Sequence, residues 1–162
     1  MGGNLHIDEF RVKPDLIAIH WPAKTATDVL THLAGRLVAM GYVKPSYTAA
    51  VLEREQTCPT GLPTRGVGTA IPHAGIEHTL KPCIAVATLA QPVKFGQLGD
   101  PDLQIDVSVV FMLSVTKPEA QVYLLQSLVQ VYRDERLLRR LQAAADPALV
   151  ADEINQALAA LT

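Results

Sequence analysis

Two segments decide the fold of this chain: CIAVATL at residues 83–89 and VSVVFMLS at residues 107–114. Both are nearly continuous apolar runs rich in branched side chains. Such runs are typical of strands covered on both faces, as in a sheet that lies between helices. Between them, the glycines and the proline of GQLGDP at residues 96–101 predict a loop. The two strands therefore predict the centre of a buried sheet.

The segments on the N-terminal side alternate between strands and helices. Thr25, followed three residues later by Asp28, predicts the start of a helix, and Gly41 is placed to end it. By composition and apolar spacing we also expect a strand at 16–20, a second helix at 45–55, a loop at 59–66 and a strand at 67–71.

The C-terminal third is helical. After Pro118, one apolar stripe consists of Leu125, Leu128, Val129 and Tyr132, and a later one of Val150, Ile154, Ala157, Leu158 and Leu161. Alternating strands and helices followed by helices alone indicate an α/β sandwich with one mixed β-sheet flanked by helices. We expect a single domain over residues 1–162, with a loose N-terminal segment at 1–14.

Composition excludes several classes of function. The 14 Lys and Arg against 16 Asp and Glu give a formal net charge of −2, whereas nucleic-acid-binding modules usually carry a basic excess. No apolar run approaches the ~20 residues of a transmembrane helix, and the N-terminus has no secretory signal. Cys58 and Cys83 lack the spacing of a redox motif. We expect a cytoplasmic protein with reduced thiols that binds no nucleic acid.

Among the five histidines, His73 has the most informative position. It follows Ala70-Ile71-Pro72 at the end of a predicted strand, and catalytic groups in α/β sheets gather outside strand ends. Pro72 restricts the backbone just before the ring. Position alone leaves a surface histidine without a chemical role as the alternative.

A metal site on His73 and His78 is a further interpretation. The two histidines are five residues apart, so they do not share a helical face, and the third ligand would have to be Glu77 or Cys83 at no familiar spacing. We therefore expect neither a metal nor another cofactor.

The residues around His73 carry a family resemblance. REQTCPTG at 54–61, followed by GTAIPH at 68–73, is similar to the phosphoacceptor region of the IIA components of the bacterial phosphoenolpyruvate-dependent phosphotransferase system, in the fructose/mannitol superfamily. The galactitol-type branch resembles the chain most, because its Pro-Thr-Gly segment and a second histidine five residues after Pro-His recur as residues 59–61 and His78.

The resemblance implies the mannitol-type EIIA fold and a phosphocarrier. His73 would accept a phosphoryl group from phospho-HPr and pass it to a cysteine of a IIB component, beside a membrane-embedded IIC permease, for uptake of galactitol or a related polyol. Arg54 matches the arginine that family members place near the phosphorylated histidine. Gln121 takes the position of a second histidine in fructose and mannitol members, and His78 is the third supporting residue.

Chemistry adds one prediction about the ring. One imidazole nitrogen has to be bare to attack phosphorus, and the other should donate its proton to an acceptor. We therefore predict a backbone carbonyl or polar side chain within hydrogen-bond reach of His73, with the reactive nitrogen left open. Backbone N–H groups at residues 74–76 would add donors if a helix begins there.

Two other functions are compatible with the sequence. The chain could be a regulatory IIA paralogue whose His73 phosphorylation controls partner binding, or a non-catalytic interaction domain that keeps the fold. The transported sugar and the oligomeric state are left open.

Overall fold

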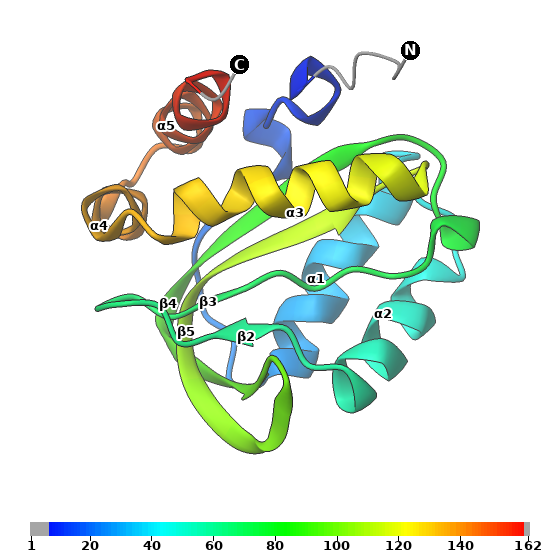
Figure 1. Cartoon of the computed structure of the whole chain (residues 1–162), viewed down its shortest axis with the longest axis horizontal. Coiled ribbons are helices and arrows are strands. Elements are labelled where there is room, and N and C mark those ends of the chain that lie inside the picture. Colours follow the sequence, from blue (N-terminus) through cyan, green and yellow to red (C-terminus); the bar gives the residue numbers. More distant parts are fainter. Residues whose placement is uncertain (1–6, 161–162) are drawn as a thin grey trace.

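A long antiparallel hairpin forms the centre of the molecule. In the computed structural model, which describes residues 7–160, β4 (Cys83–Gln97) pairs with β5 (Asp100–Ser114) (Figure 1). The register places Cys83 opposite Ser114 and is interrupted between Thr88 and Val93. The two predicted apolar runs therefore pair with each other as the buried half of this hairpin.

The hairpin extends well beyond the predicted runs. The loop expected at 96–101 is reduced to a turn at Leu98 and Gly99, where Gly99 has a φ of +81°. The outer half of the hairpin is mostly exposed, with only Val93 and Phe95 buried among residues 90–106, so it lacks the continuous apolar run by which we identified the inner half. The loop prediction was wrong because strand pairing here depends on backbone hydrogen bonds rather than on burial.

Three short strands complete the mixed sheet, in the order β1-β4-β2-β3-β5. β1 (Ile17–Trp21) runs parallel to β4, and β3 (Thr69–Ala70) runs parallel to β5. β2 (Gly61–Leu62) pairs antiparallel with β3 and lies inside the segment that we expected to be a loop. The strand predicted at 67–71 is limited to the two residues of β3.

Two glycines explain how the chain enters β3. Gly66 has a φ of +76°, a conformation that favours glycine, and a Cβ on Gly68 would collide with the carbonyl of Asp106 in β5. The Gly68 carbonyl accepts the N–H of Ser108 at 2.9 Å. The glycines therefore permit a close backbone approach to β5, upstream of His73.

Helices cover both faces of the sheet (Figure 1). Val86 and Phe111 belong to a core with α3 (Pro118–Tyr132), α4 (Glu135–Ala143) and α5 (Pro147–Ala159). The alternate positions Ala85 and Met112 belong to a core with α1 (Ala26–Ala39) and α2 (Tyr47–Thr57). The two cores confirm the α/β sandwich.

Local signals place α1 as predicted. The Asp28 N–H donates to the Thr25 hydroxyl at 3.2 Å, while the Thr25 N–H donates to the Asp28 carboxylate at 3.1 Å. This reciprocal capping box satisfies two donors that the helix itself leaves unpaired. Gly41 follows with a φ of +78°, as expected for the residue after a helix C-terminus.

The C-terminal helices differ from the prediction in phase and number. The buried stripe of α3 includes Leu124, Leu128 and Val131, one position before most of the expected stripe, and Leu125 and Tyr132 are only partly buried against the core. α4 is a separate short helix. In α5, Val150, Ile154 and Leu158 are buried as expected, and Leu161 lies outside the described residues.

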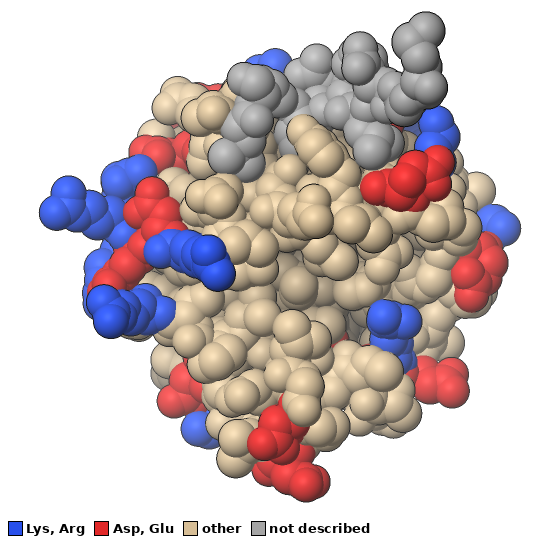
Figure 2. Space-filling model, viewed as in Figure 1, with Lys and Arg blue, Asp and Glu red and all other residues tan. Residues whose placement is uncertain are grey.

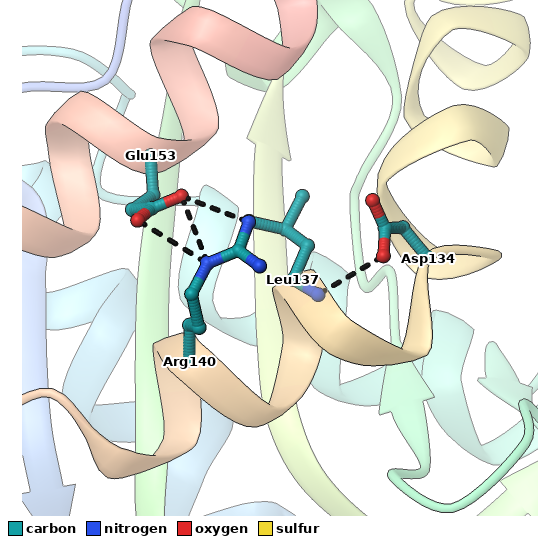
Figure 3. A network of polar contacts seen from close by, with 4 residues as sticks. All are labelled: Asp134, Leu137, Arg140 and Glu153. Atoms are coloured by element: carbon teal, nitrogen blue, oxygen red, sulfur yellow. Dashed lines mark hydrogen bonds and ion pairs between the residues drawn. The ribbon is translucent and has the colours of Figure 1, made fainter.

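Polar contacts stabilise the start of α4 and the corner between α4 and α5 (Figure 3). The Asp134 carboxylate accepts the N–H of Leu137 at 3.0 Å and caps α4. The Arg140 guanidinium contacts the Glu153 carboxylate of α5 at 3.2 Å. The first contact fixes the start of α4, and the second joins α4 to α5.

The N-terminal segment corrects one expectation. Phe10 and Val12 are buried in the core shared with α3–α5, and the Val12 N–H and carbonyl pair with the Asn155 side-chain amide at 2.8 and 2.9 Å. The expected loose segment at 1–14 is therefore anchored from Phe10 onward, because its apolar side chains find a partner in α5. No helix within residues 7–160 is long and apolar enough to cross a membrane.

Candidate functional site

His73 lies just after β3 and is paired with the end of β5. An isolated parallel bridge joins His73 to Leu113, and the Pro72 carbonyl accepts the Leu113 N–H at 3.0 Å. From α2, the buried Tyr47 hydroxyl donates to the Leu113 carbonyl at 2.6 Å. The backbone that carries the histidine is therefore held by the sheet and by α2, while 9% of the residue's surface stays exposed.

The hydrogen bond of the His73 ring determines its tautomer. Nδ1 lies 2.9 Å from the Ile71 carbonyl oxygen. Because a carbonyl oxygen can only accept, Nδ1 carries the proton, and Nε2 has a lone pair when the ring is neutral. No residue between 7 and 160 makes a hydrogen bond with Nε2. The predicted orienting acceptor is confirmed, and the bare nitrogen is Nε2.

Burial keeps this ring neutral. The low-dielectric surroundings lower the pKa of His73, the Ile71 carbonyl raises it in part, and the Arg54 charge lowers it further. A neutral imidazole is the nucleophilic form. The lowered pKa therefore favours the neutral ring, in which Nε2 keeps its lone pair.

Arg54 is the cation that acts on His73. It lies in the last turn of α2, is exposed, and its charge contributes to the lowered pKa of the histidine. Its guanidinium makes no hydrogen bond or ion pair within the described part of the chain. The structure therefore leaves the donors of this guanidinium available for an anion.

His78 and Gln121 are not hydrogen-bonded to His73 in the part of the chain that the structure describes. His78 lies in the short 3-10 turn η3 (Ile76–His78), with Nδ1 2.8 Å from the Ser46 hydroxyl and Nε2 3.5 Å from the Glu77 carboxylate. Gln121 is half-buried in the first turn of α3. Figure 1 shows the start of α3 and η3 on the same side of the molecule. We expected additional backbone N–H donors at residues 74–76 if a helix begins there. The structure has only this 3-10 turn at that place.

The described part of the chain offers no cluster of ligands for the metal site that we considered as an alternative. Within residues 7–160, no three His, Cys, Asp or Glu side chains lie together in a way that could hold an ion. Cys83 is buried, which raises the pKa of its thiol to about 12 and disfavours the thiolate that a metal would need.

Glu55 and Thr60 belong to the 54–61 motif, but the sequence predicted no role for either residue. Glu55 accepts the N–H of Thr60 at 2.8 Å, and burial raises the pKa of its carboxyl to about 7, against the lowering effects of Thr60 and Arg54. Thr60 is buried and contacts Ile71, the residue whose carbonyl orients His73. The sequence did show these two residues as a polar pair within the 54–61 motif. It could not show that Thr60 contacts Ile71, because that contact depends on the path of the loop.

The surface near these elements is weakly charged. Figure 2 shows a broad uncharged face over β2, β3 and α3, with blue Lys and Arg side chains gathered to one side, where α4 lies. Four arginines belong to α4 and the residues just before it: Arg133, Arg136, Arg139 and Arg140. This face therefore combines an uncharged surface with positively charged side chains at its margin.

Comparisons with known proteins agree with this geometry. Residues 11–157 match the family model "Phosphoenolpyruvate-dependent sugar phosphotransferase system, EIIA 2". The galactitol-specific EIIA component of Escherichia coli K12 is 33% identical over 102 residues, which cover 63% of this chain and 67% of that protein. The mannitol-specific EIICBA component of the same organism is 27% identical over 135 residues, 82% of this chain and 20% of that protein.

A solved structure supports the same assignment. The IIA component for mannitol from E. coli, in its complex with phosphorylated enzyme IIB, matches with a TM-score of 0.72 at 26% identity, covering 93% of this chain and 99% of that one. The fold around His73 is thus the mannitol-type EIIA fold, and the chain belongs to the EIIA 2 family of the phosphoenolpyruvate-dependent sugar phosphotransferase system.

Proposed function

We propose that this domain is a phosphocarrier that accepts a phosphoryl group on Nε2 of His73 and passes it to a cysteine of a IIB component. The observation that carries the proposal is the Nδ1 hydrogen bond to the Ile71 carbonyl, because it leaves Nε2 as the bare nitrogen of a neutral ring. The cytoplasm is the compartment that the proposal assigns to this exchange.

In each transfer one bond to phosphorus forms and one breaks, and the total charge does not change. The Nε2 lone pair attacks the phosphorus of phospho-HPr, so a new N–P bond forms while the N–P bond to the donor imidazole breaks. The proton on Nδ1 stays in place. A IIB thiolate then attacks the same phosphorus, an S–P bond forms, and the His73 ring leaves in its neutral form.

Arg54 supports both transfers electrostatically. Phosphoryl transfer spreads negative charge over three equatorial oxygens, and a planar guanidinium with several donors suits them. Gln121 and His78 are proposed as supporting residues that approach the phosphoryl group or the partner. The neutral face in Figure 2 suits brief docking of two successive partners.

The choice of galactitol or a related polyol as the transported sugar rests on relatives. Three galactitol-specific EIIA components are 33% identical to the chain. A IIC permease would contact the sugar itself, so the proposal places the sugar preference in the partners.

A regulatory role is the second candidate. The Bacillus subtilis transcriptional regulator ManR is 33% identical over 102 residues, 63% of this chain and 14% of that protein. Transfer from phosphorylated His73 to the cysteine of a galactitol-type IIB protein would support transport. Stable labelling without transfer to any IIB would support regulation.

Labelling tests the acceptor itself. Incubation with radioactive phosphoenolpyruvate, enzyme I and HPr should label the chain on one histidine with an acid-labile bond. His73→Ala should abolish the label, whereas His20→Ala, which removes an exposed histidine outside the proposed site, is the matched histidine control and should keep it. Labelling that persists in His73→Ala would refute the proposal and favour the non-catalytic alternative for His73.

A further inference from the structure

A series of hydrogen bonds behind His73 begins at Glu55, which has no part in the transfer steps above. The Thr60 N–H donates to Glu55 Oε1 at 2.8 Å, and the Thr60 hydroxyl lies 3.0 and 3.1 Å from the two carboxyl oxygens. The same hydroxyl oxygen accepts the Ile71 N–H at 3.2 Å, and the Thr60 carbonyl lies 3.4 Å from that N–H. The Ile71 carbonyl in turn accepts from Nδ1 of His73 at 2.9 Å.

We infer that Glu55 is a positioning residue for the His73 ring. By holding Thr60 against Ile71, it directs the Ile71 carbonyl at Nδ1 and keeps the proton off Nε2. The consequence for phosphoryl transfer rests on the proposed function, whereas the effect on the ring tautomer does not.

Ile71 needs this support because of Pro72. The Ile71 carbonyl belongs to an amide without an N–H, and the following proline restricts Ile71 to extended backbone conformations. Its own N–H is then the remaining backbone group that can set its orientation. Thr60 and Ile71 are 3% and 6% exposed, so water cannot readily replace the Thr60 acceptor.

The carboxyl group can anchor Thr60 in either protonation state. Burial raises the pKa of Glu55 to about 7, and Arg54 is the charged group that acts on both this carboxyl and His73. A protonated carboxyl still offers a carbonyl oxygen to the Thr60 N–H. A glutamine offers the same oxygen in the same shape, so it is the conservative replacement.

Removing the Glu55 carboxyl should change the tautomer of the His73 ring and not only the stability of the fold. A ring without its acceptor can carry the proton on either nitrogen, and a proton on Nε2 blocks attack. Groups that orient a metal-binding histidine through its other ring nitrogen contribute about 10- to 100-fold, and we expect a loss of about tenfold in phosphorylation rate here by the same logic.

The experiment is ¹⁵N NMR of the imidazole in the intact chain, combined with phosphorylation by phospho-HPr. Wild type should show the proton on Nδ1 above the pKa of His73. Glu55→Ala and Thr60→Val should show a mixture of tautomers and slower phosphorylation. Glu55→Gln and Thr60→Ser should keep both the Nδ1–H tautomer and the wild-type rate of phosphorylation. Glu53→Gln, an exposed glutamate on the same helix, is the matched control and should match wild type.

The outcomes separate this inference from the proposed function. Wild type that is never phosphorylated, with a tautomer that still shifts in Glu55→Ala, would refute the phosphocarrier and support the positioning role. Folded Glu55→Ala with an unchanged Nδ1–H signal would overturn the inference, even if the thermal midpoint falls. Should Glu55→Ala not fold, Thr60→Val against Thr60→Ser decides by the same criterion.

Discussion

The segment from Glu55 to His73 and the corner between α4 and α5 both depend on carboxyl groups, but in opposite surroundings. Glu55 reaches Thr60, which is 3% exposed, whereas Glu153 pairs with Arg140, whose side chain is 53% exposed. Water can replace a partner lost at the corner but not behind the site. Polar contacts of similar geometry should therefore have large effects in the first region and small ones in the second.

The largest effect should come from the cation at the site. Arg54→Ala should slow phosphorylation of His73 by about 100-fold, as for other donors that stabilise developing charge. It should change the free energy of unfolding only a little, because its exposed guanidinium makes no hydrogen bond or ion pair within residues 7–160. Arg54→Lys should recover part of the rate, since it restores charge without the planar fork. Rapid-quench labelling measures the rates.

Arg140→Ala is the control for that experiment. It removes an exposed arginine from the other region and should keep the wild-type labelling rate. An equal loss in both variants would mean that general positive charge, rather than Arg54, assists transfer.

The next effect is the pH dependence that Glu55 contributes. Burial raises its pKa from 4.5 to about 7, so the folded state keeps a proton that the unfolded state releases. This contribution to stability is fully present below pH 4.5 and is lost as pH rises through 7. Relative to Glu55→Gln, wild type should lose about 1–2 kcal/mol of unfolding free energy between roughly pH 5 and 8.

Urea unfolding of both proteins at several pH values measures this difference. His73 titrates in both, so its contribution cancels in the comparison. A difference that stays constant with pH would contradict the buried carboxyl and would weaken the contrast between the two regions.

A smaller effect is expected from the cap at the start of α4, the helix that carries Arg140. Asp134→Ala removes the acceptor for the Leu137 N–H and should lower the unfolding free energy by about 1 kcal/mol. Asp134→Asn keeps a capping oxygen and should lose little. An equal loss in both variants, measured by urea unfolding, would show that the charge rather than the cap matters.

The smallest effect should come from the exposed ion pair. Arg140→Ala should change the unfolding free energy by at most about 0.5 kcal/mol, because water screens the pair. A double-mutant cycle with Glu153→Gln isolates the coupling. A coupling above about 1 kcal/mol would mean that the corner resembles the buried segment after all.

Much of the fold could be predicted because its signals are local. The capping box of Thr25 and Asp28 lies within one helical turn, and residues 83–89 and 107–114 carry the composition of buried strands. The phase of α3 could not be predicted in this way. Apolar residues occupy adjacent positions such as Leu124 and Leu125, so two neighbouring stripes fit the sequence equally well and packing selects one.

The candidate site, too, could be predicted only in part. His73 was found from its place after a predicted strand and from the Ala-Ile-Pro-His segment, and the need for an orienting acceptor followed from imidazole chemistry. The identity of that acceptor and the contacts of Glu55 could not be predicted. They depend on the path of the loop that places Thr60 beside Ile71, and no periodicity encodes that path.

The sequence by itself therefore determined the sandwich, its first helix and the histidine at its sheet, because burial patterns and caps act between residues close in the chain. Only the tertiary structure decided that Nε2 is the bare nitrogen, that the exposed half of the hairpin is strand, and that Phe10 and Val12 join the core. Each of these depends on which groups meet across the fold, and a buried hydrogen bond or apolar contact acquires its energy only after that meeting.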